Sequence, residues 1–121
     1  MFKRSEKVAE AIHELISELI VKGLKDPRIG FVTVTGVKMT EDLHLATVYF
    51  TVIGSDSEKK ATEQGLNSAK GFIRKEMGKS LHMRYTPDLV FRYDESIEYG
   101  NRIESILKEL SAGERDDDRE D

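Results

Sequence analysis

The sequence predicts an α+β domain with a three-stranded sheet and helices packed on it, in the chain order α-β-β-α-α-β-α. Three observations lead to this fold class. Apolar residues recur at helical spacing over residues 5–24, and they alternate at strand spacing within residues 31–53. A helical segment interrupted by glycines follows, and a short strand begins after Pro87. Because 121 residues fit one domain, these elements are expected to share one core.

The first helix is expected over residues 5–24. Its apolar positions follow helical spacing and comprise Val8, Ile12, Leu15, Ile16, Leu19 and Gly23. Ser5 is expected to be the N-cap, because a serine hydroxyl can accept a hydrogen bond from a free backbone N–H of the first turn. Gly23, followed by Pro27, predicts the end of the helix.

Two strands are expected next, at residues 31–39 and 44–53. The short polar loop at residues 40–43 between them predicts an antiparallel hairpin. The apolar phase of the first strand slips at Gly36, which predicts a β-bulge. The second strand carries apolar residues on both faces, so we expect it to be the central strand of the sheet.

The helical segment after the turn at residues 54–57 contains three glycines. Each glycine costs roughly 1 kcal/mol relative to alanine inside a helix. We therefore expect a break or kink near residues 69–71 that divides the segment into two helices. Ala69 and Gly71 are interpreted as structural residues of this kink, which let the two helices approach closely.

A strand over residues 88–93 and a last helix after Asp94 complete the predicted fold. The apolar stripe of the last helix comprises Ile97, Ile103, Ile106, Leu107 and Leu110. The final stretch, residues 112–121, carries six acidic side chains and two arginines, with no apolar side chain after Ala112. Such a segment cannot bury enough apolar surface to offset its ordering entropy. We expect one domain at residues 1–111 and a disordered acidic tail at residues 112–121.

The composition argues against several classes of function. The absence of cysteine excludes disulfides and cysteine-bound metals, and the three histidines fall on a helix, a strand and a loop without metal-ligand spacing. No glycine-rich phosphate-binding motif or nucleophile elbow occurs, so we expect no enzymatic activity and no cofactor. No apolar run approaches the ~20 residues of a membrane span. The charged N-terminus does not resemble a signal peptide, so a cytoplasmic protein with no membrane partner is expected.

Positive charge is concentrated in one part of the chain. Residues 70–92 carry six basic and two acidic side chains, in a chain whose formal net charge is -4. The six cations are Lys70, Arg74, Lys75, Lys79, Arg84 and Arg92. A local excess of this size is typical of a surface that binds a polyanion. The alternative is the solvated charged face of an ordinary helix.

The order α-β-β-α-α-β is the topology of a type II KH domain, an RNA-binding module that clamps phosphates with a GXXG loop between two helices. The corresponding place here reads Ala69-Lys70-Gly71. Five stretches of the chain resemble the ribosome-binding factor A family. They are Arg4 before the first helix, residues 26–30 (DPRIG), residues 32–37 with 40–43 (VTVTGV and TEDL), residues 69–74 (AKGFIR), and residues 83–91 (MRYTPDLVF) leading to Asp94.

This resemblance implies a KH-like fold in which the Ala-x-Gly stretch forms an interhelical kink in place of GXXG. It implies a ribosome assembly factor that binds the small (30S) ribosomal subunit and its 16S rRNA during late maturation. It also implies support for processing of the five-prime end of the rRNA and importance at low temperature. We expect the free protein to be a monomer. The alternatives are a protein-interaction or oligomerisation module without direct RNA contact, and a small hydrolase. The cationic cluster favours RNA, because a protein-binding face should be more apolar.

The candidate RNA-binding residues are Arg4, Arg28, Lys70, Arg74, Lys75, Lys79 and Arg84. Arginine and lysine are expected here because folded rRNA is read mainly through phosphates and sugars. An alternative role for Arg84 is an ion pair with Asp88 or Asp94. An alternative role for Arg28 is to cap the end of the first helix, and Arg4 could belong to a frayed terminus.

Two aromatic residues lie beside the cations. Phe72 falls off the apolar stripe of its helix, and Tyr85 lies in the basic loop. Either ring is a candidate for stacking on an unpaired base, an interaction worth ~1–3 kcal/mol. The alternative is that each ring covers the edge of the core.

Overall fold

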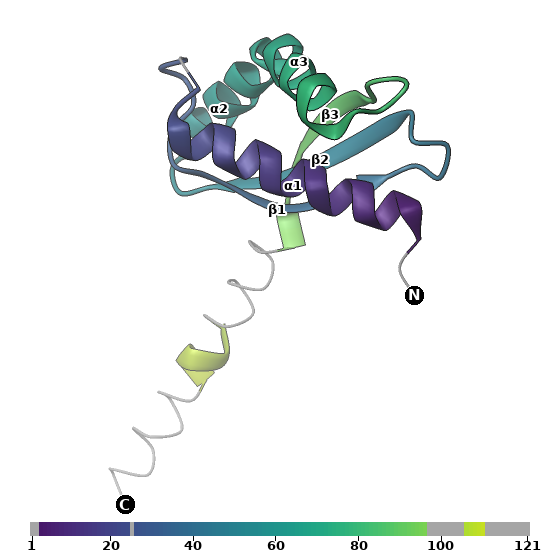
Figure 1. Ribbon diagram of the computed structural model, residues 1–121. Helices are drawn as coiled ribbons and strands as arrows, with labels where there is room; N and C mark the ends of the chain where they lie inside the picture. The colour runs from purple at the N-terminus through teal and green to yellow at the C-terminus, as the bar shows by residue number, and fades with distance from the viewer. Residues whose placement is uncertain (1–2, 25, 97–105, 111–121) are drawn as a thin grey trace, which may run out of the picture.

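The structure is a computed structural model that describes residues 3–24, 26–96 and 106–110. Its elements in chain order are α1 (Arg4–Lys22), β1 (Val32–Met39), β2 (Leu45–Val52), α2 (Asp56–Ser68), α3 (Lys70–Leu81) and β3 (Asp88–Tyr93). Figure 1 shows all three of these helices on one face of the sheet. The domain is therefore a two-layer α+β fold, as the sequence predicts.

Helix α1 begins one residue earlier than expected. Its N-cap is Lys3, so the prediction that Ser5 is the N-cap is wrong. Ser5 is buried together with Ala9 and Ile12, because these positions continue the helical spacing of the buried stripe. The helix ends as predicted at Gly23, whose φ of 89° lies in the region that favours glycine.

Strand β2 is the central strand of the sheet, as predicted. Strand β1 pairs with it in antiparallel fashion, and β3 pairs with it in parallel fashion. Alternate residues of β2 are buried under the helices, namely Ala46, Val48, Phe50 and Val52. The parallel pairing needs a long crossover connection, which α2 and α3 provide.

The predicted bulge lies in β1, where α1 contacts the outer edge of the sheet. The register with β2 shifts between Val34 and Gly36. The backbone N–H of Ile53 donates to the Phe31 carbonyl at 3.4 Å, so Phe31 is a hydrogen-bonded position of the antiparallel pair. Because such positions alternate along the strand, Val34, three residues later, turns its carbonyl away from β2. His13 of α1 forms a hydrogen bond with this carbonyl, and its Nε2 lies 3.1 Å from the oxygen. Because a carbonyl oxygen only accepts, His13 Nε2 carries the proton.

A hydrogen-bonded carboxylate ties the end of β3 to the bulge of β1. The Thr35 hydroxyl donates to Asp94 Oδ2 at 2.6 Å. Asp94 Oδ1 accepts from the backbone N–H and the hydroxyl of Ser96. These hydrogen bonds lower the pKa of Asp94, with the Ser96 hydroxyl the largest cause and the Thr35 hydroxyl the next. Both edge strands are thereby connected across β2.

The long helical segment is broken, as the sequence predicts. Helix α2 ends at Ser68 and α3 begins at Lys70. Ala69 between them has φ of -83° and ψ of -5°. Its N–H still donates to the carbonyls of Gly65 and Leu66, at 3.0 and 3.1 Å. The break therefore falls at Ala69, and α3 starts immediately afterwards.

The core lies between the helices and the inner face of the sheet. Its helical side is formed by Ile12, Ile16, Leu66, Ile73 and Met77, and its sheet side includes Val48, Phe50, Leu89 and Phe91. The rings of Phe50 and Tyr93 meet edge to face, with centroids 5.9 Å apart. This core fixes which side of α3 faces the solvent.

The predictions for the C-terminal segment fall mostly outside the described residues. Of the expected last helix, residues 95–96 and 106–110 are helical. Ile106, Leu107 and Leu110 are exposed. Ile97, Ile103 and the expected acidic tail at residues 112–121 lie outside the described residues.

Candidate nucleic-acid interface

The solvent side of α3 carries one aromatic and two basic side chains. Ile73 and Met77 are fully buried, and at 3.6 residues per turn the opposite side of α3 holds Phe72, Lys75 and Lys79. All three side chains are exposed. We call Phe72, Lys75 and Lys79 the α3 face. It combines a flat apolar ring with two cations one and two turns further along the helix.

Arg74 does not belong to this face, although the sequence predicts it as an RNA contact. Its Nε donates to the Pro87 carbonyl at 3.0 Å, and Nη2 donates to the Thr86 carbonyl at 3.2 Å. Nη2 also lies 3.4 Å from the carboxylate of Asp88. The guanidinium therefore joins α3 to the start of β3, and the ion pair considered for Arg84 with Asp88 is made by Arg74.

The other predicted cations of this region differ in their surroundings. Lys70 is half-buried. Lys79 Nζ lies 3.8 Å from the carboxylate of the half-buried Glu76, a surface pair of the kind that contributes little to stability. Arg84 is exposed, and its guanidinium carbon lies 5.4 Å from the centre of the Tyr85 ring. Lys75, Lys79 and Arg84 therefore present charge to the solvent, whereas Lys70 does so only in part.

Arg92 lies on the other side of the sheet. It alternates along β3 with Leu89 and Phe91, which are buried under the helices. Successive side chains of a strand point to opposite faces, so Arg92 projects from the face that is opposite α3. The hypothesis that all six cations of residues 70–92 form one surface is therefore wrong.

Arg28 is held by a clasp of hydrogen bonds on the loop between α1 and β1. Its Nε donates to Asp26 Oδ1 at 3.0 Å, and its Nη2 donates to Asp26 Oδ2 at 2.6 Å. Nη2 also donates to the Ser68 hydroxyl oxygen of α2 at 2.9 Å. Two parallel bonds to one carboxylate fix the plane of the guanidinium. Arg28 is thus directed toward α2 and not toward the end of α1.

The clasp changes the titration of Asp26. The Arg28 side chain is the largest cause, and the Arg28 backbone N–H the next; together they lower the pKa of Asp26 from 3.8 to about 2. The folded pKa lies below the ordinary value, so the clasp contributes stability above about pH 4. This contribution is lost as the pH falls toward about 2.

Replacing Asp26 by asparagine should remove this acid-dependent contribution. We expect Asp26→Asn to be less stable than the wild type near neutral pH and to lose less stability between about pH 4 and about pH 2. Chemical denaturation across this range measures both effects, with Glu14→Gln on the exposed side of α1 as the matched control. Parallel stability curves for wild type and Asp26→Asn in acid would contradict the clasp.

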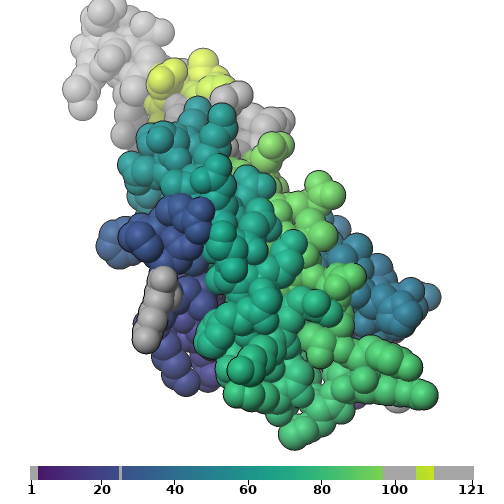
Figure 2. Space-filling model, turned by 90° about the horizontal axis from the view of Figure 1, so that it is seen from above, coloured from purple at the N-terminus to yellow at the C-terminus, as the bar shows by residue number. Residues whose placement is uncertain are grey.

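The loop that bears Arg28 packs tightly on α2, and Figure 2 shows this blue loop against the teal helices. A methyl group at Gly65 would lie 2.7 Å from Ile29 Cγ1 and 3.3 Å from Arg28 Cβ. The buried Thr62 donates from its hydroxyl to the Arg28 carbonyl at 3.3 Å. A methyl group at Gly71 would meet no described atom within 4 Å. Gly71 therefore shows no close contact of the kind expected for it, whereas Gly65 makes a close contact with the Arg28 loop that sequence reasoning missed.

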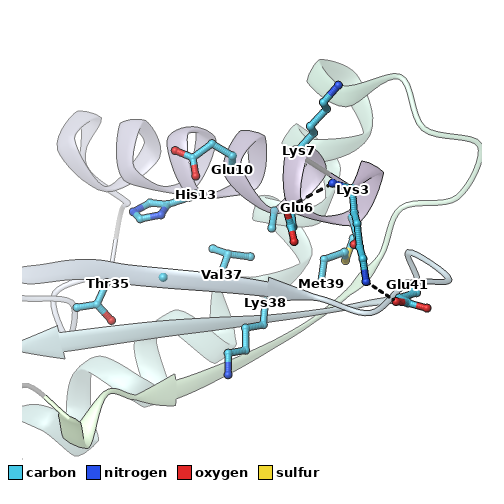
Figure 3. A pocket seen from close by; sticks show the side chains of 13 residues that line it. Lys3, Glu6, Lys7, Glu10, His13, Thr35, Val37, Lys38, Met39 and Glu41 are labelled. Atoms are coloured by element: carbon cyan, nitrogen blue, oxygen red, sulfur yellow. Dashed lines mark hydrogen bonds and ion pairs between the residues drawn. The ribbon is translucent and has the colours of Figure 1, made fainter. Parts of the chain in front are cut away.

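A hollow of about 980 Å³ lies between the first turns of α1 and strand β1 (Figure 3). Its charged lining residues are Lys3, Lys7, Lys38, Glu6, Glu10 and Glu41. Figure 3 shows Lys7 and Lys38 pointing to opposite sides, and Lys3 Nζ lies 3.2 Å from the Glu41 carboxylate. Balanced charges do not attract a polyanion. Arg4 is exposed at the start of α1, and its contact with RNA stays a prediction.

Two further features are absent from the residues that the structure describes. They include no cluster of three or more acidic, histidine or cysteine side chains arranged to hold a metal ion. None of the helices in that part of the chain is both long and apolar enough to cross a bilayer.

Comparison with known proteins decides the family. The profile described as ribosome-binding factor A matches residues 4–107. The chain is 81% identical over 121 residues to the ribosome-binding factor A of Geotalea uraniireducens (strain Rf4), covering 100% of this chain and 99% of that protein. The chain belongs to the ribosome-binding factor A family.

Solved structures of ribosome-binding factor A share this fold. The crystal structure from Thermus thermophilus matches with a TM-score of 0.64 and 20% identity, covering 74% of this chain and 94% of that one. A homology model of Thermus thermophilus ribosome binding factor A, fitted into the cryo-EM map of a 30S complex, matches with a TM-score of 0.58 and 22% identity, covering 78% of this chain and 97% of that one. The predicted KH-like α+β fold is confirmed. The ribosome-binding factor A profile also spans both the clasp and the α3 face.

Proposed function

We propose that this chain is a ribosome assembly factor that binds the small ribosomal subunit through its 16S rRNA during late maturation, without catalysing a covalent step. The observation that carries this proposal is the α3 face, where Lys75 and Lys79 stand exposed beside a solvent-facing ring. Family membership supports it, because a relative of the same fold was fitted into the map of a 30S complex. Folded RNA is bound mainly through phosphates and shape, which suits exposed cations on a rigid helix.

The finer parts of the proposal follow from this role. Within the domain at residues 1–111, the break at Ala69 takes the place of the GXXG loop of KH domains, and Gly71 follows it as the start of the exposed helix. The factor supports processing of the five-prime end of the rRNA, and its contribution is greatest in the cold, when RNA helices rearrange slowly. It acts as a cytoplasmic monomer.

Binding to the small subunit should weaken steeply as the salt concentration rises. Among residues 70–92, four candidate cations remain available on the helical side of the domain, namely Lys70, Lys75, Lys79 and Arg84. At about 0.7 released counterions per phosphate contact, these four should contribute about −3 to the slope of log K against log salt. Arg74 and Arg92 are left out because one is engaged with the loop before β3 and the other lies on the opposite face.

Co-sedimentation with purified immature small subunits between about 50 and 200 mM salt measures this slope. Large subunits are the control for non-specific attraction to rRNA. Equal binding to both subunits, or binding that does not change with salt, would contradict the proposal. Crosslinks confined to ribosomal proteins would instead support a protein-interaction module without direct RNA contact.

A further inference from the structure

We propose that the hollow between the α1–β1 loop and the start of α3 receives one unpaired nucleotide of the bound RNA. The base stacks on the Phe72 ring, and a phosphate is contacted by Arg28. This inference rests on the proposed function, because it names a nucleotide subsite within that RNA-binding role.

The hollow has about 430 Å³ and is lined by Gly23, Leu24, Asp26, Ser68, Ala69 and Phe72. Leu24 and Ala69 give the hollow an apolar lining, and both are packed partly against the core. Phe72 remains 50% exposed at the wall of the hollow. An exposed aromatic ring beside hydroxyl and carboxylate groups is the arrangement that recognises an unpaired base, by stacking on its face and hydrogen bonding to its edge.

Arg28 has hydrogen-bond capacity left beside this hollow. A guanidinium has five N–H groups. Its Nε and Nη2 bind Asp26 and Ser68, which both line the hollow. Within the described part of the chain, no acceptor is bound to Nη1. Nη1 can therefore donate outward to a phosphate, while the bound carboxylate holds the fork in position before RNA arrives.

The loop that carries Arg28 is anchored strongly enough to act as one wall of a site. The Arg28 carbonyl accepts a hydrogen bond from the buried hydroxyl of Thr62. The side chains of Arg28 and Ile29 pack so closely on Gly65 that a methyl group there would have no room. The carboxylate of Asp26 is paired with Arg28, so it does not present an uncompensated negative charge to RNA. A preformed wall lowers the ordering cost of binding.

The hollow is continuous with the rest of the proposed surface. Phe72 is the first member of the α3 face, and Lys75 and Lys79 follow it on the same side of the helix. An RNA strand that places one base in the hollow would therefore bring its neighbouring phosphates close to these two lysines. This continuity favours RNA over an apolar protein side chain as the occupant, because a protein contact would need no cations beside the ring.

Substitutions at position 72 separate stacking from simple apolar cover. Phe72→Leu keeps apolar bulk and removes the ring, Phe72→Ala removes both, and Phe72→Trp enlarges the ring. We expect Phe72→Leu and Phe72→Ala to weaken binding to purified immature small subunits by about tenfold or more, and Phe72→Trp to bind at least as well as the wild type. Phe31→Ala is the matched control, because Phe31 is 86% exposed and lies outside the hollow.

Photocrosslinking identifies the occupant. A benzophenone amino acid at position 72 should crosslink to one short stretch of rRNA when the protein is bound to the subunit, and thermal melting should show that every variant is folded. Wild-type affinity in Phe72→Leu, or crosslinks to a ribosomal protein alone, would overturn the nucleotide subsite and leave the proposed function standing. Failure of the wild type to bind small subunits would overturn both.

Discussion

Reversing the charges of Lys75 and Lys79 to glutamate should weaken binding to the small ribosomal subunit by more than about tenfold near 0.1 M salt. Both side chains stand on the exposed side of α3. The variant loses two attractive contacts and places two negative charges beside rRNA phosphates. The slope of log K against log salt should also become shallower by about 1.4, at about 0.7 per lost contact.

Co-sedimentation with immature small subunits at several salt concentrations measures both the affinity and the slope. The matched control is the double variant Lys7→Glu, Lys60→Glu, which changes the total charge equally at two other exposed lysines. If the control weakens binding as strongly as the α3 variant, net charge alone explains the loss. Wild-type affinity in the α3 variant would remove this face from the interface.

The choice of lysines depends on the structure. From the sequence alone, Arg74 and Lys75 are the obvious pair for charge reversal. Arg74, however, donates to the Pro87 and Thr86 carbonyls. Its replacement by glutamate would leave those acceptors without their donor, so weaker binding could reflect damage to the loop before β3. Lys79 avoids this ambiguity.

Gly65→Ala should destabilise the domain by about 1–2 kcal/mol, because overpacking a tight contact costs about 1–3 kcal/mol and the gain in helix propensity is at most about 1 kcal/mol. The new methyl group would lie 2.7 Å from Ile29 Cγ1. Either the side chain or the whole Arg28 loop must move to accommodate it.

Gly71→Ala is the matched control for Gly65→Ala, and it should act in the opposite direction. A methyl group at Gly71 meets no described atom within 4 Å, so the variant should gain about 0.5–1 kcal/mol from restricting the unfolded chain. In thermal denaturation, the midpoints of the two variants should differ by roughly 4–8 °C for each kcal/mol of difference in stability. Urea denaturation should rank the two variants in the same order. Equal stability of both variants would show that the loop does not pack on α2 as described.

Much of the fold can be predicted because short-range patterns decide it. The strand at residues 88–93 has the predicted bounds, since Pro87 marks its start and its inward residues alternate. The bulge in β1 follows from a slip in the apolar phase at Gly36. The break at Ala69 follows from the glycines around it, which lower helix propensity locally.

Two predictions were wrong although the sequence contains the signals that would have corrected them. Ser5 is buried because it stands four residues before Ala9 in the stripe, so extending the helical period backward would have placed it inside α1. Arg92 alternates with Leu89 and Phe91, and if all helices cover one face of the sheet, it must point away from α3. The preference of serine for N-caps and the clustering of cations along the chain were weaker constraints than the periodicity of the helix and of the strand in which these residues lie.

The candidate site was less predictable, because its geometry depends on contacts between distant segments. The sequence marks Arg28 and Phe72 but cannot show that Arg28 reaches Ser68 of α2 or that a hollow lies between them. It likewise cannot show that Arg74 binds the carbonyls of Thr86 and Pro87. The role of Gly65 was hidden because helix propensity concerns one helix, whereas its neighbour is a loop from another part of the chain.

The imidazole of His13 has a consequence for the behaviour of the protein in concentrated solution. An unpaired strand border with regularly spaced carbonyls and amides is a template on which other molecules extend a cross-β stack. Here the Val34 oxygen is already occupied, and the surplus residue Thr35 interrupts the spacing beside it. A foreign strand arriving at this border would find its hydrogen-bond ladder broken at the centre. The bulge and the His13 hydrogen bond together therefore disfavour the addition of further strands to this edge of β1.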